Sequence, residues 1–367
     1  MTDPRLKKLA EILVHYSCTI KKGDKVVIAS DLVGEPLVQE VFAETIRAGG
    51  NPIVSYSTGA MMETFYKEAS QEQLEWISPT TLYMFEDADA FFSLRASDNS
   101  RVLSNVDPEK QALAAKARTD IRKIYKERSA SGALRWVIAQ FPCQAHAQDA
   151  DMSLTDYEDF VYSACFAGHD DPVGEWNKLH AMQETLINWL KGKKEITLKS
   201  SNADLRLSID GRSFINSAGK NNMPSGEIFT SPVEDSINGW VNFSYPAVRV
   251  GREVNGIRLE IKDGKVQKAS ATKNEEYLLS QLAVDEGASY FGEWAIGTNY
   301  GIKQFTKNIL FDEKIGGSFH MAVGSGFSEA GGKNDSAIHW DMICDIQKDS
   351  EIRVDGDLFY KDGQFQI

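Results

Sequence analysis

The sequence predicts two domains of different class, an α/β N-terminal domain with an open, mostly parallel sheet and a β-rich α+β C-terminal domain. The chain has 367 residues, about twice the length of a typical domain of roughly 150 residues. Its first half alternates continuous apolar runs with charged helical stretches, whereas short alternating runs prevail after about residue 192. We therefore expect domains at 1–192 and 193–367.

The first half begins with a helix followed by a βαβ unit. Pro4 suits a first helical position, and apolar residues recur at helical spacing from Leu6 to Leu13. The apolar run 25–30 is typical of a buried parallel strand, and the helix that follows begins at Pro36. Further strands are expected near 52–57, 90–96 and 135–142, and further helices near 107–127 and 171–192.

The pattern of the second half predicts strands and hairpins. Eight short runs alternate polar and apolar residues, and Asp-Gly pairs at 263–264 and 362–363 predict tight turns between strands. One helix is expected to interrupt them, from a cap at Asn274 to Gly287. This half therefore predicts an antiparallel, β-rich domain.

Charge and composition exclude several classes of partner. With 40 Lys and Arg against 53 Asp and Glu, the formal net charge is −13, which argues against nucleic acid or an anionic membrane as the main partner. No run approaches the ~18 apolar residues of a membrane span, and the start lacks the apolar core of a signal peptide. We expect a cytoplasmic protein in which the four cysteines are reduced.

Most of the usual catalytic motifs are missing. The sequence has no HExxH motif, no GxSxG elbow, no Walker loop and no GxGxxG after the first strand. The segment 324–329 starts like a dinucleotide loop but ends in Glu329, so a phosphate site is not expected there. Four histidines stand alone without a second ligand at metal spacing and are expected to be structural or exposed: His15, His146, His169 and His180.

The two remaining histidines lie on expected strands. Alternation along a strand puts His339 and Asp341 on one face, with Trp340 and its apolar neighbours on the other. His320 shares its face with small residues such as Ala322, which leave room for an ion. A His-x-Asp pair by itself more often marks a solvated sheet face than a metal site.

Carboxylates in apolar or glycine-rich surroundings strengthen the metal hypothesis. Glu227, Glu293 and Glu313 occur in such segments, although each alone could be an exposed strand residue. Burying an ionised carboxylate without a partner is costly, so such positions call for a cation or a proton. Together with Asp341 they carry four negative charges, which two divalent cations neutralise. Adding the two imidazoles gives an N/O ligand set typical of zinc, cobalt or manganese, and of hydrolytic chemistry.

These segments resemble the thermophilic aminopeptidase family of metallopeptidases, the aminopeptidase T-like or leucyl aminopeptidase-like enzymes. The likeness rests on NMPSGEIFTSP, FGEWAIG, LFDE, HMAVGSGF and GGKNDSAIHWDM, in that order and at similar spacing. It extends upstream through FPCQAHAQDADMSLTDYEDFVYSAC to the KGDKVVIAS strand, and so covers nearly the whole chain.

The resemblance implies a cytoplasmic homodimeric aminopeptidase with two metal ions per chain in the C-terminal domain. Peptides with a free N-terminus would be its substrates, and a metal-bound hydroxide would attack the scissile carbonyl. Glu293 is expected to move the proton to the leaving amine. By motif match, the implied metal ligands are Glu227, Glu293, Glu313, His320, His339 and Asp341.

Three departures from the family pattern leave other functions open. The family has a tyrosine, proposed to donate a hydrogen bond to the reaction intermediate, where this chain has Phe327, which is expected at the substrate. The spacing from Glu313 to His320 is longer, and that from His320 to His339 is shorter. One alternative is a mononuclear non-haem iron ring-cleaving dioxygenase that uses His320, His339 and Asp341. The other is a metal-binding homologue without turnover.

Overall fold

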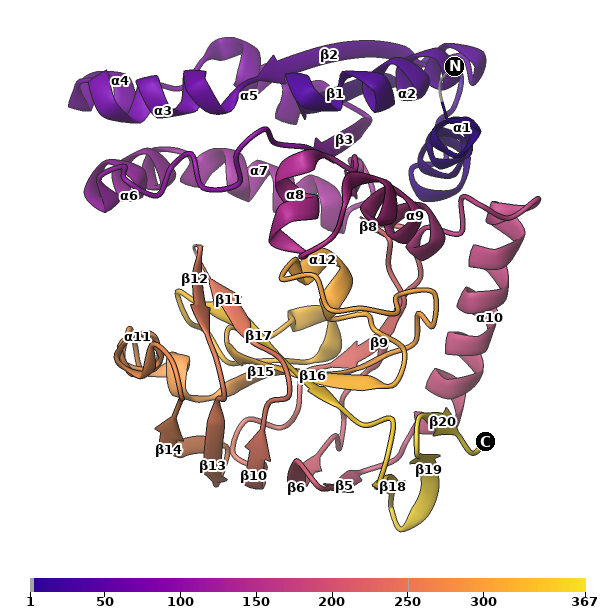
Figure 1. The fold of residues 1–367 in the computed structure, drawn as a ribbon, viewed down its shortest axis with the longest axis vertical. Helices are drawn as coiled ribbons and strands as arrows, with labels where there is room; N and C mark the ends of the chain where they lie inside the picture. Colours follow the sequence, from indigo (N-terminus) through magenta and orange to yellow (C-terminus); the bar gives the residue numbers. More distant parts are fainter. Residues whose placement is uncertain (1–2, 250) are drawn as a thin grey trace. The chain divides into compact units, whose positions relative to one another are not determined.

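A computed structural model describes residues 3–249 and 251–367 (Figure 1). The contacts divide the chain into two compact units, Met1–Val173 with Gly219–Pro224, and Gly174–Ala218 with Ser225–Ile367. The boundary expected at residue 192 falls inside the second unit, and the domain limits 1–192 and 193–367 stay a prediction.

A parallel five-stranded sheet forms the centre of the first unit, in the order β2-β1-β3-β4-β8. The apolar runs become its strands because both faces of a parallel sheet are covered, and Val26, Val27 and Ile28 of the first strand are buried. The strands are β1 (Lys25–Asp31), β2 (Asn51–Ser57), β3 (Ala90–Arg95), β4 (Arg135–Gln140) and β8 (Asn222–Met223).

Helices connect these strands. Where a single helix is expected at 107–127, the structure has two, because the chain leaves helical geometry at Arg118 (φ −86°, ψ 13°). The helices are α1 (Pro4–Glu11), which continues as a π-helix (Ile12–Ser17), α2 (Glu35–Arg47), α3 (Gly59–Glu68), α4 (Gln71–Glu75), α5 (Pro79–Asp87), α6 (Pro108–Ala117), α7 (Thr119–Ala130), α8 (Gln144–Asp149) and α9 (Leu154–Ala164).

The second unit is built on antiparallel sheets. An eight-stranded sheet runs β14-β13-β10-β6-β5-β18-β19-β20, and a five-stranded sheet runs β17-β16-β15-β9-β7. The strands of the larger sheet are β5 (Glu195–Ser200), β6 (Ala203–Ser208), β10 (Asn238–Asn242), β13 (Arg258–Lys262), β14 (Lys265–Ser270), β18 (Ser350–Val354), β19 (Asp357–Lys361) and β20 (Gln364–Phe365).

The smaller sheet, which we call the site sheet, lies beside several short elements. Its strands are β7 (Ile215–Ser217), β9 (Glu227–Thr230), β15 (Phe291–Gly297), β16 (Ser318–Gly324) and β17 (His339–Asp345). Other elements of the unit include α10 (Pro172–Leu190), which belongs to it from Gly174 on, the hairpin β11 (Ala247–Arg249) and β12 (Arg252–Val254), α11 (Glu275–Leu282) and α12 (Ile309–Asp312).

One hydrophobic core joins the two large sheets of the second unit. The larger sheet contributes residues such as Leu198 and Leu205, and the site sheet contributes Trp294, Met321 and Met342. Side chains alternate between the two faces along a strand. Since these residues of the site sheet face the core, the residues that alternate with them lie on the opposite face. The predicted fold class, an α/β half followed by a β-rich half, is confirmed.

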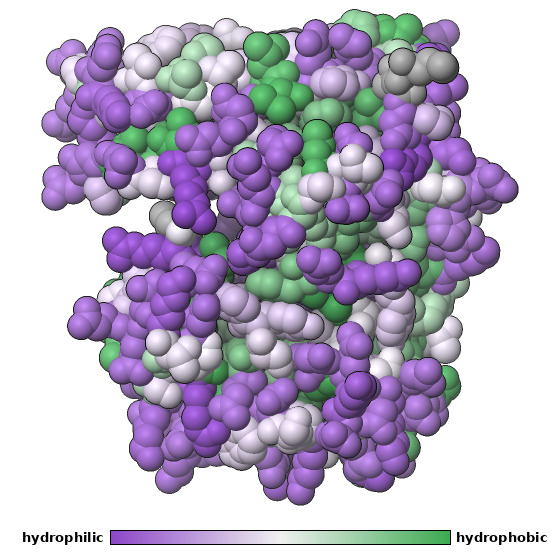
Figure 2. All heavy atoms as spheres, viewed as in Figure 1, coloured by the Kyte–Doolittle hydropathy of each residue, from purple (hydrophilic) through white to green (hydrophobic). Residues whose placement is uncertain are grey.

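Among the described residues, no helix is long and apolar enough to cross a membrane. The face drawn in Figure 2 is covered mainly by hydrophilic residues, and hydrophobic residues are visible there in small groups. This distribution agrees with the burial of the large apolar residues in the cores of the two units.

Gly297 at the end of β15 permits a close approach of two backbone segments. A Cβ atom at this position would lie 2.1 Å from the carbonyl oxygen of Ile315. The contact is with backbone, which cannot turn aside as a flexible side chain can, so a larger residue would push the segments apart.

We therefore expect Gly297→Ala to lower the free energy of unfolding by about 1–3 kcal/mol, as measured by urea denaturation. Gly168→Ala is the matched control, because a Cβ at exposed Gly168 would meet nothing within 4 Å, and its effect should stay within about 0.5 kcal/mol. Equal stability of the two variants would contradict the close approach.

Candidate metal centre

The register of three neighbouring strands collects the predicted site residues on one face of the site sheet. Glu293 on β15 lies opposite Ala322 on β16, and Ala322 lies opposite Asp341 on β17. His320 lies two residues before Ala322 on β16, and His339 lies two residues before Asp341 on β17. Because side chains two residues apart on a strand share a face, both histidines point to the same face as the carboxylates. The small side chain of Ala322 leaves space between the two carboxylates.

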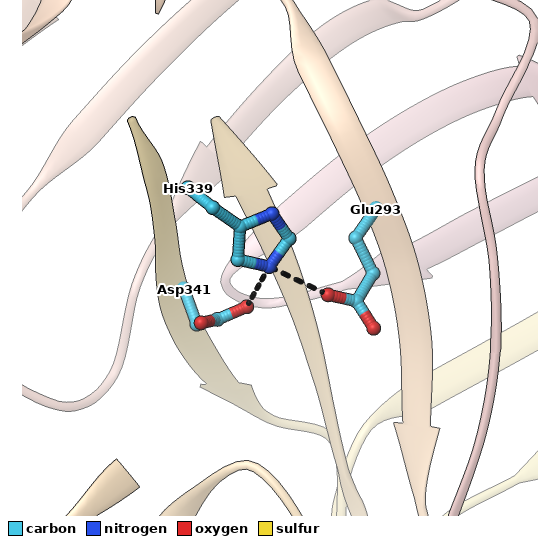
Figure 3. A group of neighbouring side chains, drawn as sticks. All are labelled: Glu293, His339 and Asp341. Carbon is cyan, nitrogen blue, oxygen red and sulfur yellow. Dashed lines mark hydrogen bonds and ion pairs between the residues drawn. The ribbon is translucent and has the colours of Figure 1, made fainter. Parts of the chain in front are cut away.

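The first cluster of possible ligands, here called the Glu293 group, comprises Glu293, His339 and Asp341, whose ligand atoms lie within 4.8 Å of one another. His339 Nε2 is 3.1 Å from Glu293 Oε2 and 3.4 Å from Asp341 Oδ1 (Figure 3). His339 Nδ1 donates a hydrogen bond to the carbonyl oxygen of Ser325 at 2.7 Å. This bond orients the ring so that Nε2 faces the carboxylates, as in many metal-binding histidines.

The second cluster, the Glu313 group, comprises Glu313, His320 and Asp341. Asp341 thus belongs to both groups. Glu227 lies beside the second group, with its Oε2 3.5 Å from His320 Nε2, and the same nitrogen is 3.6 Å from Glu293 Oε1. The structure therefore brings all six predicted metal ligands into one connected cluster, whose role as ligands stays a proposal.

Loops outside the sheet position Glu227. The buried Asn299 donates from Nδ2 to the carbonyl oxygen of Ser225 at 2.8 Å, which holds the turn before Glu227. Gly226 in this turn has φ +121°, and a Cβ there would lie 2.6 Å from the Asn299 Cβ. Ser225 and Gly226 of the NMPSGE motif thus fix the backbone of the turn that positions Glu227.

Glu313 follows the short helix α12, which a buried hydrogen-bonded turn stabilises. Asp312 Oδ1 accepts from the backbone N–H of Thr306 at 2.7 Å and from its hydroxyl at 2.9 Å. Burial raises the pKa of Asp312 to about 7 despite these bonds. The aspartate of the FDE motif therefore holds the turn, while Glu313 faces the cluster.

Sequence reasoning missed Lys314, the residue after Glu313. Its side chain is fully buried, its Nζ lies 3.4 Å from Glu227 Oε1, and it also pairs with Glu313 Oε1. A lysine in a charged segment such as LFDEK is ordinarily a surface residue. The glycines that follow it, in KIGG, gave no signal that the chain turns inward here.

Burial and opposite charges together set the protonation of the cluster. Burial would raise the pKa of Glu293, but His320 and His339 outweigh it and lower that pKa. The pKa of Asp341 is lowered in the same way, chiefly by His339. Burial opposes the charge on the imidazoles, yet the carboxylates raise the pKa of His320 to about 9 and that of His339 to about 12.

Three polar atoms of the cluster are buried without a hydrogen-bond partner among the described residues, namely Glu227 Oε2, His320 Nδ1 and Asp341 Oδ1. Buried polar atoms ordinarily have partners, so such exceptions call for an explanation. Carboxylate oxygens and imidazole nitrogens are the ligands that zinc and related divalent metals take. The residues present therefore fit a divalent metal centre.

Phe327 lies at the edge of the cluster. Its ring meets the His339 ring edge to face, with centroids 5.1 Å apart, and also packs on Phe229 at 4.9 Å. Its backbone N–H donates to Ser231 Oγ at 2.9 Å. The half-buried ring thus covers His339 without offering a hydroxyl group.

Comparison with known proteins agrees with this geometry. A family model described as thermophilic metalloprotease (M29) matches residues 2–365. Aminopeptidase 2 of Geobacillus stearothermophilus is 26% identical over 403 aligned residues, which cover 99% of this chain and 95% of that protein.

Two solved structures show the fold. Wild-type AmpT from Thermus thermophilus superposes with a TM-score of 0.86 at 22% identity and covers 99% of both chains. The 2,5-dihydroxypyridine dioxygenase from Pseudomonas putida KT2440 is more distant, with a TM-score of 0.59 at 15% identity, over 100% of this chain and 98% of that one. The family match, the curated relative and the fold confirm the predicted resemblance and the metallopeptidase class: the chain belongs to the thermophilic metalloprotease family M29.

Proposed function

We propose that this M29 protein is an aminopeptidase that binds two divalent cations, of zinc, cobalt or manganese, at Glu227, Glu293, Glu313, His320, His339 and Asp341. The observation that carries the proposal is Asp341, which belongs to both ligand groups. Each group adds one histidine and one further carboxylate to this shared aspartate. A carboxylate shared in this way suits two adjacent ions, which bound here would polarise a carbonyl and activate water.

Glu293 is the proposed catalytic acid and base. Its Oε1 faces His320 at 3.6 Å and its Oε2 faces His339 at 3.1 Å, so it lies between the two groups. Its lowered pKa keeps it ionised near neutral pH. It can therefore accept a proton from the attacking water and pass that proton to the amine that leaves.

A substrate with a free N-terminus suits a centre of metal ions and carboxylates. An unprotonated α-amine is a nitrogen ligand that a divalent ion can accept, and a protonated α-amine can pair with a nearby carboxylate. An acetylated N-terminus has neither a basic nitrogen nor a charge and would lose both contacts. Aminopeptidase 2 of Geobacillus stearothermophilus, to which the chain is similar, is likewise called an aminopeptidase. These points support peptides with a free amino end as substrates, cleaved after the first residue.

We assign Phe327 to the substrate-binding surface, because its ring packs against His339 at the edge of the cluster. A phenyl ring can contact an apolar substrate side chain, but it cannot donate a hydrogen bond to a developing oxyanion. Loss of one such donor costs about 10²–10³ in turnover in other enzymes. We therefore expect either slow turnover or a donor from another residue.

The dioxygenase alternative would need His320, His339 and Asp341 around one iron. Four carboxylates in one cluster exceed the single carboxylate that such a site requires, and the fold alone is shared with the solved dioxygenase.

A homologue without turnover is the other alternative, and the absence of a hydroxyl group on Phe327 favours it. A cytoplasmic location and a homodimeric state complete the proposal.

The proposal is tested by incubating the protein with paired peptides that differ only in N-terminal acetylation, in the presence of zinc, cobalt or manganese. We expect release of the first amino acid from free peptides only, and no release after a chelator is added. Cleavage of both peptides, or of neither with any metal, would contradict an aminopeptidase.

We expect Glu293→Gln to lower kcat for release of the first residue by about 10²- to 10⁴-fold, the usual share of an acid-base group. The exposed Glu276→Gln serves as the matched control and should keep full activity. Metal analysis of both variants separates loss of an ion from loss of proton transfer. Unchanged turnover in Glu293→Gln would remove this residue from the mechanism.

Metal binding should strengthen as the pH rises. Without metal, the carboxylates raise the pKa of His320 to about 9, so below that pH a cation must displace a proton from this imidazole. We expect the apparent affinity for Mn²⁺ to increase from about pH 6 to about pH 8, with proton release. Calorimetry in buffers of different ionisation enthalpy measures both effects, and an affinity independent of pH would contradict this protonation state.

A further inference from the structure

Lys314 is a positively charged side chain inside the proposed metal centre. It has no exposed surface, and its Nζ contacts Glu313 Oε1 and lies 3.4 Å from Glu227 Oε1. Burying an ammonium group is costly unless carboxylates compensate it. These two partners are also proposed metal ligands, so the ammonium and a metal ion would compete for the same oxygens.

The backbone holds Lys314 in this place from both sides. Its N–H donates to the carbonyl oxygen of Phe311 at 3.0 Å, and its own carbonyl oxygen accepts from the N–H of Asn299 at 3.1 Å. The side chain of the same Asn299 also holds the turn before Glu227. One residue therefore fixes the relative position of the lysine backbone and of Glu227.

The ion pairs of Lys314 lie on the side of the Glu313 group, while its charge also acts on Asp341, which both groups share. Among the described residues, Lys314 forms ion pairs with Glu313 and with Glu227, which lies beside His320. Within the part of the chain that the structure describes, the ion pairs of His339 are with Glu293 and Asp341, and neither involves Lys314. The two halves of the centre are therefore electrostatically different.

The net charge of the cluster indicates how the position of Lys314 affects the binding of each metal ion. With the carboxylates ionised and the imidazoles neutral, as ligands must be to bind metal, the four acids carry four negative charges and Lys314 carries one positive charge. The first divalent ion leaves one negative charge on the cluster. The second ion would leave one positive charge, and it would enter the group that already holds the ammonium.

We propose that Lys314 acts as a built-in cation of the Glu313 group, so that the first divalent ion binds tightly at the Glu293 group and the second binds more weakly beside Lys314. The inference rests on the proposed two-metal centre and adds an order of loading to it. In this protein the second ion would exchange readily, and the concentration of free metal would then regulate the activity.

The experiment titrates the full-length protein, freed of metal by a chelator, with Mn²⁺ alone in an isothermal titration calorimeter. We expect two binding steps for the wild-type protein, the second weaker by roughly tenfold or more, because like charges a few ångströms apart repel strongly in a partly buried site. Bound metal is counted independently after gel filtration at low free Mn²⁺, where we expect one ion per chain.

Lys314→Met removes the charge and keeps most of the side-chain volume. We expect the second step to tighten by roughly tenfold or more, while the first step changes little and so reports that the centre remains folded. Lys314→Gln is the second variant, should the methionine variant fail to fold. Lys303→Met is the matched control at an exposed lysine of the same unit, and both of its steps should match the wild type.

Three outcomes would overturn the inference in different ways. Two steps with the same affinities in the wild type and Lys314→Met would remove Lys314 from metal binding and leave the two-metal centre intact. A single step in both proteins would contradict the two-metal centre itself, and with it the inference. Weakening of the second step in the variant would show that Lys314 organises its neighbours instead of competing with the ion.

Thermal unfolding provides a readout that does not depend on calorimetric heats. Without metal, Lys314→Met leaves Glu227 and Glu313 without their buried counter-charge, so we expect it to unfold at a lower temperature than the wild type. Because an ion bound to the folded state stabilises it, saturating Mn²⁺ should reduce this difference. A difference that metal leaves unchanged would contradict the competition of Lys314 and a metal ion for the same carboxylates.

Discussion

The need to balance buried negative charge governs the second unit of this protein. Glu227 and Glu293 are each only 5% exposed, and ionised carboxylates at such depth require cations close by. The structure places two imidazoles and one ammonium group against them. The same requirement explains the raised pKa values of the histidines and the fit of the cluster to divalent metal ions.

The site sheet meets this need because its two faces have different tasks. One face contributes Trp294, Met321 and Met342 to the core shared with the larger sheet, which stabilises the strands without help from the polar face. The opposite face can therefore concentrate charge that would be costly in a sheet with no such anchor. On that face the small side chain of Ala322 leaves space beside Glu293, and Gly297 lets the backbone of Ile315 come close.

Segments outside the site sheet position three of the charged side chains of the cluster. Asn299 links the turn before Glu227 to the backbone of Lys314, and Asp312 holds the turn that presents Glu313. The chain belongs to the thermophilic metalloprotease family M29 and shares its fold with a solved relative. Its cluster contains a buried lysine beside Glu227 and a phenylalanine against His339. Side chains at such positions can change metal affinity and turnover while the fold stays the same.

The sequence was sufficient to predict the fold class, because apolar runs and strict alternation are local signals of buried parallel and half-buried antiparallel strands. It also determined the face that His339 shares with Asp341, since alternation within a strand needs no partner. That Asp341 belongs to both groups of possible ligands became visible only in the structure, because it depends on how the strands pair. The buried position of Lys314 and the place of Gly219–Pro224 in the first unit were likewise seen only in the structure. Hydrogen bonds between backbone segments far apart in the sequence hold both segments, and no local sequence pattern encodes such contacts.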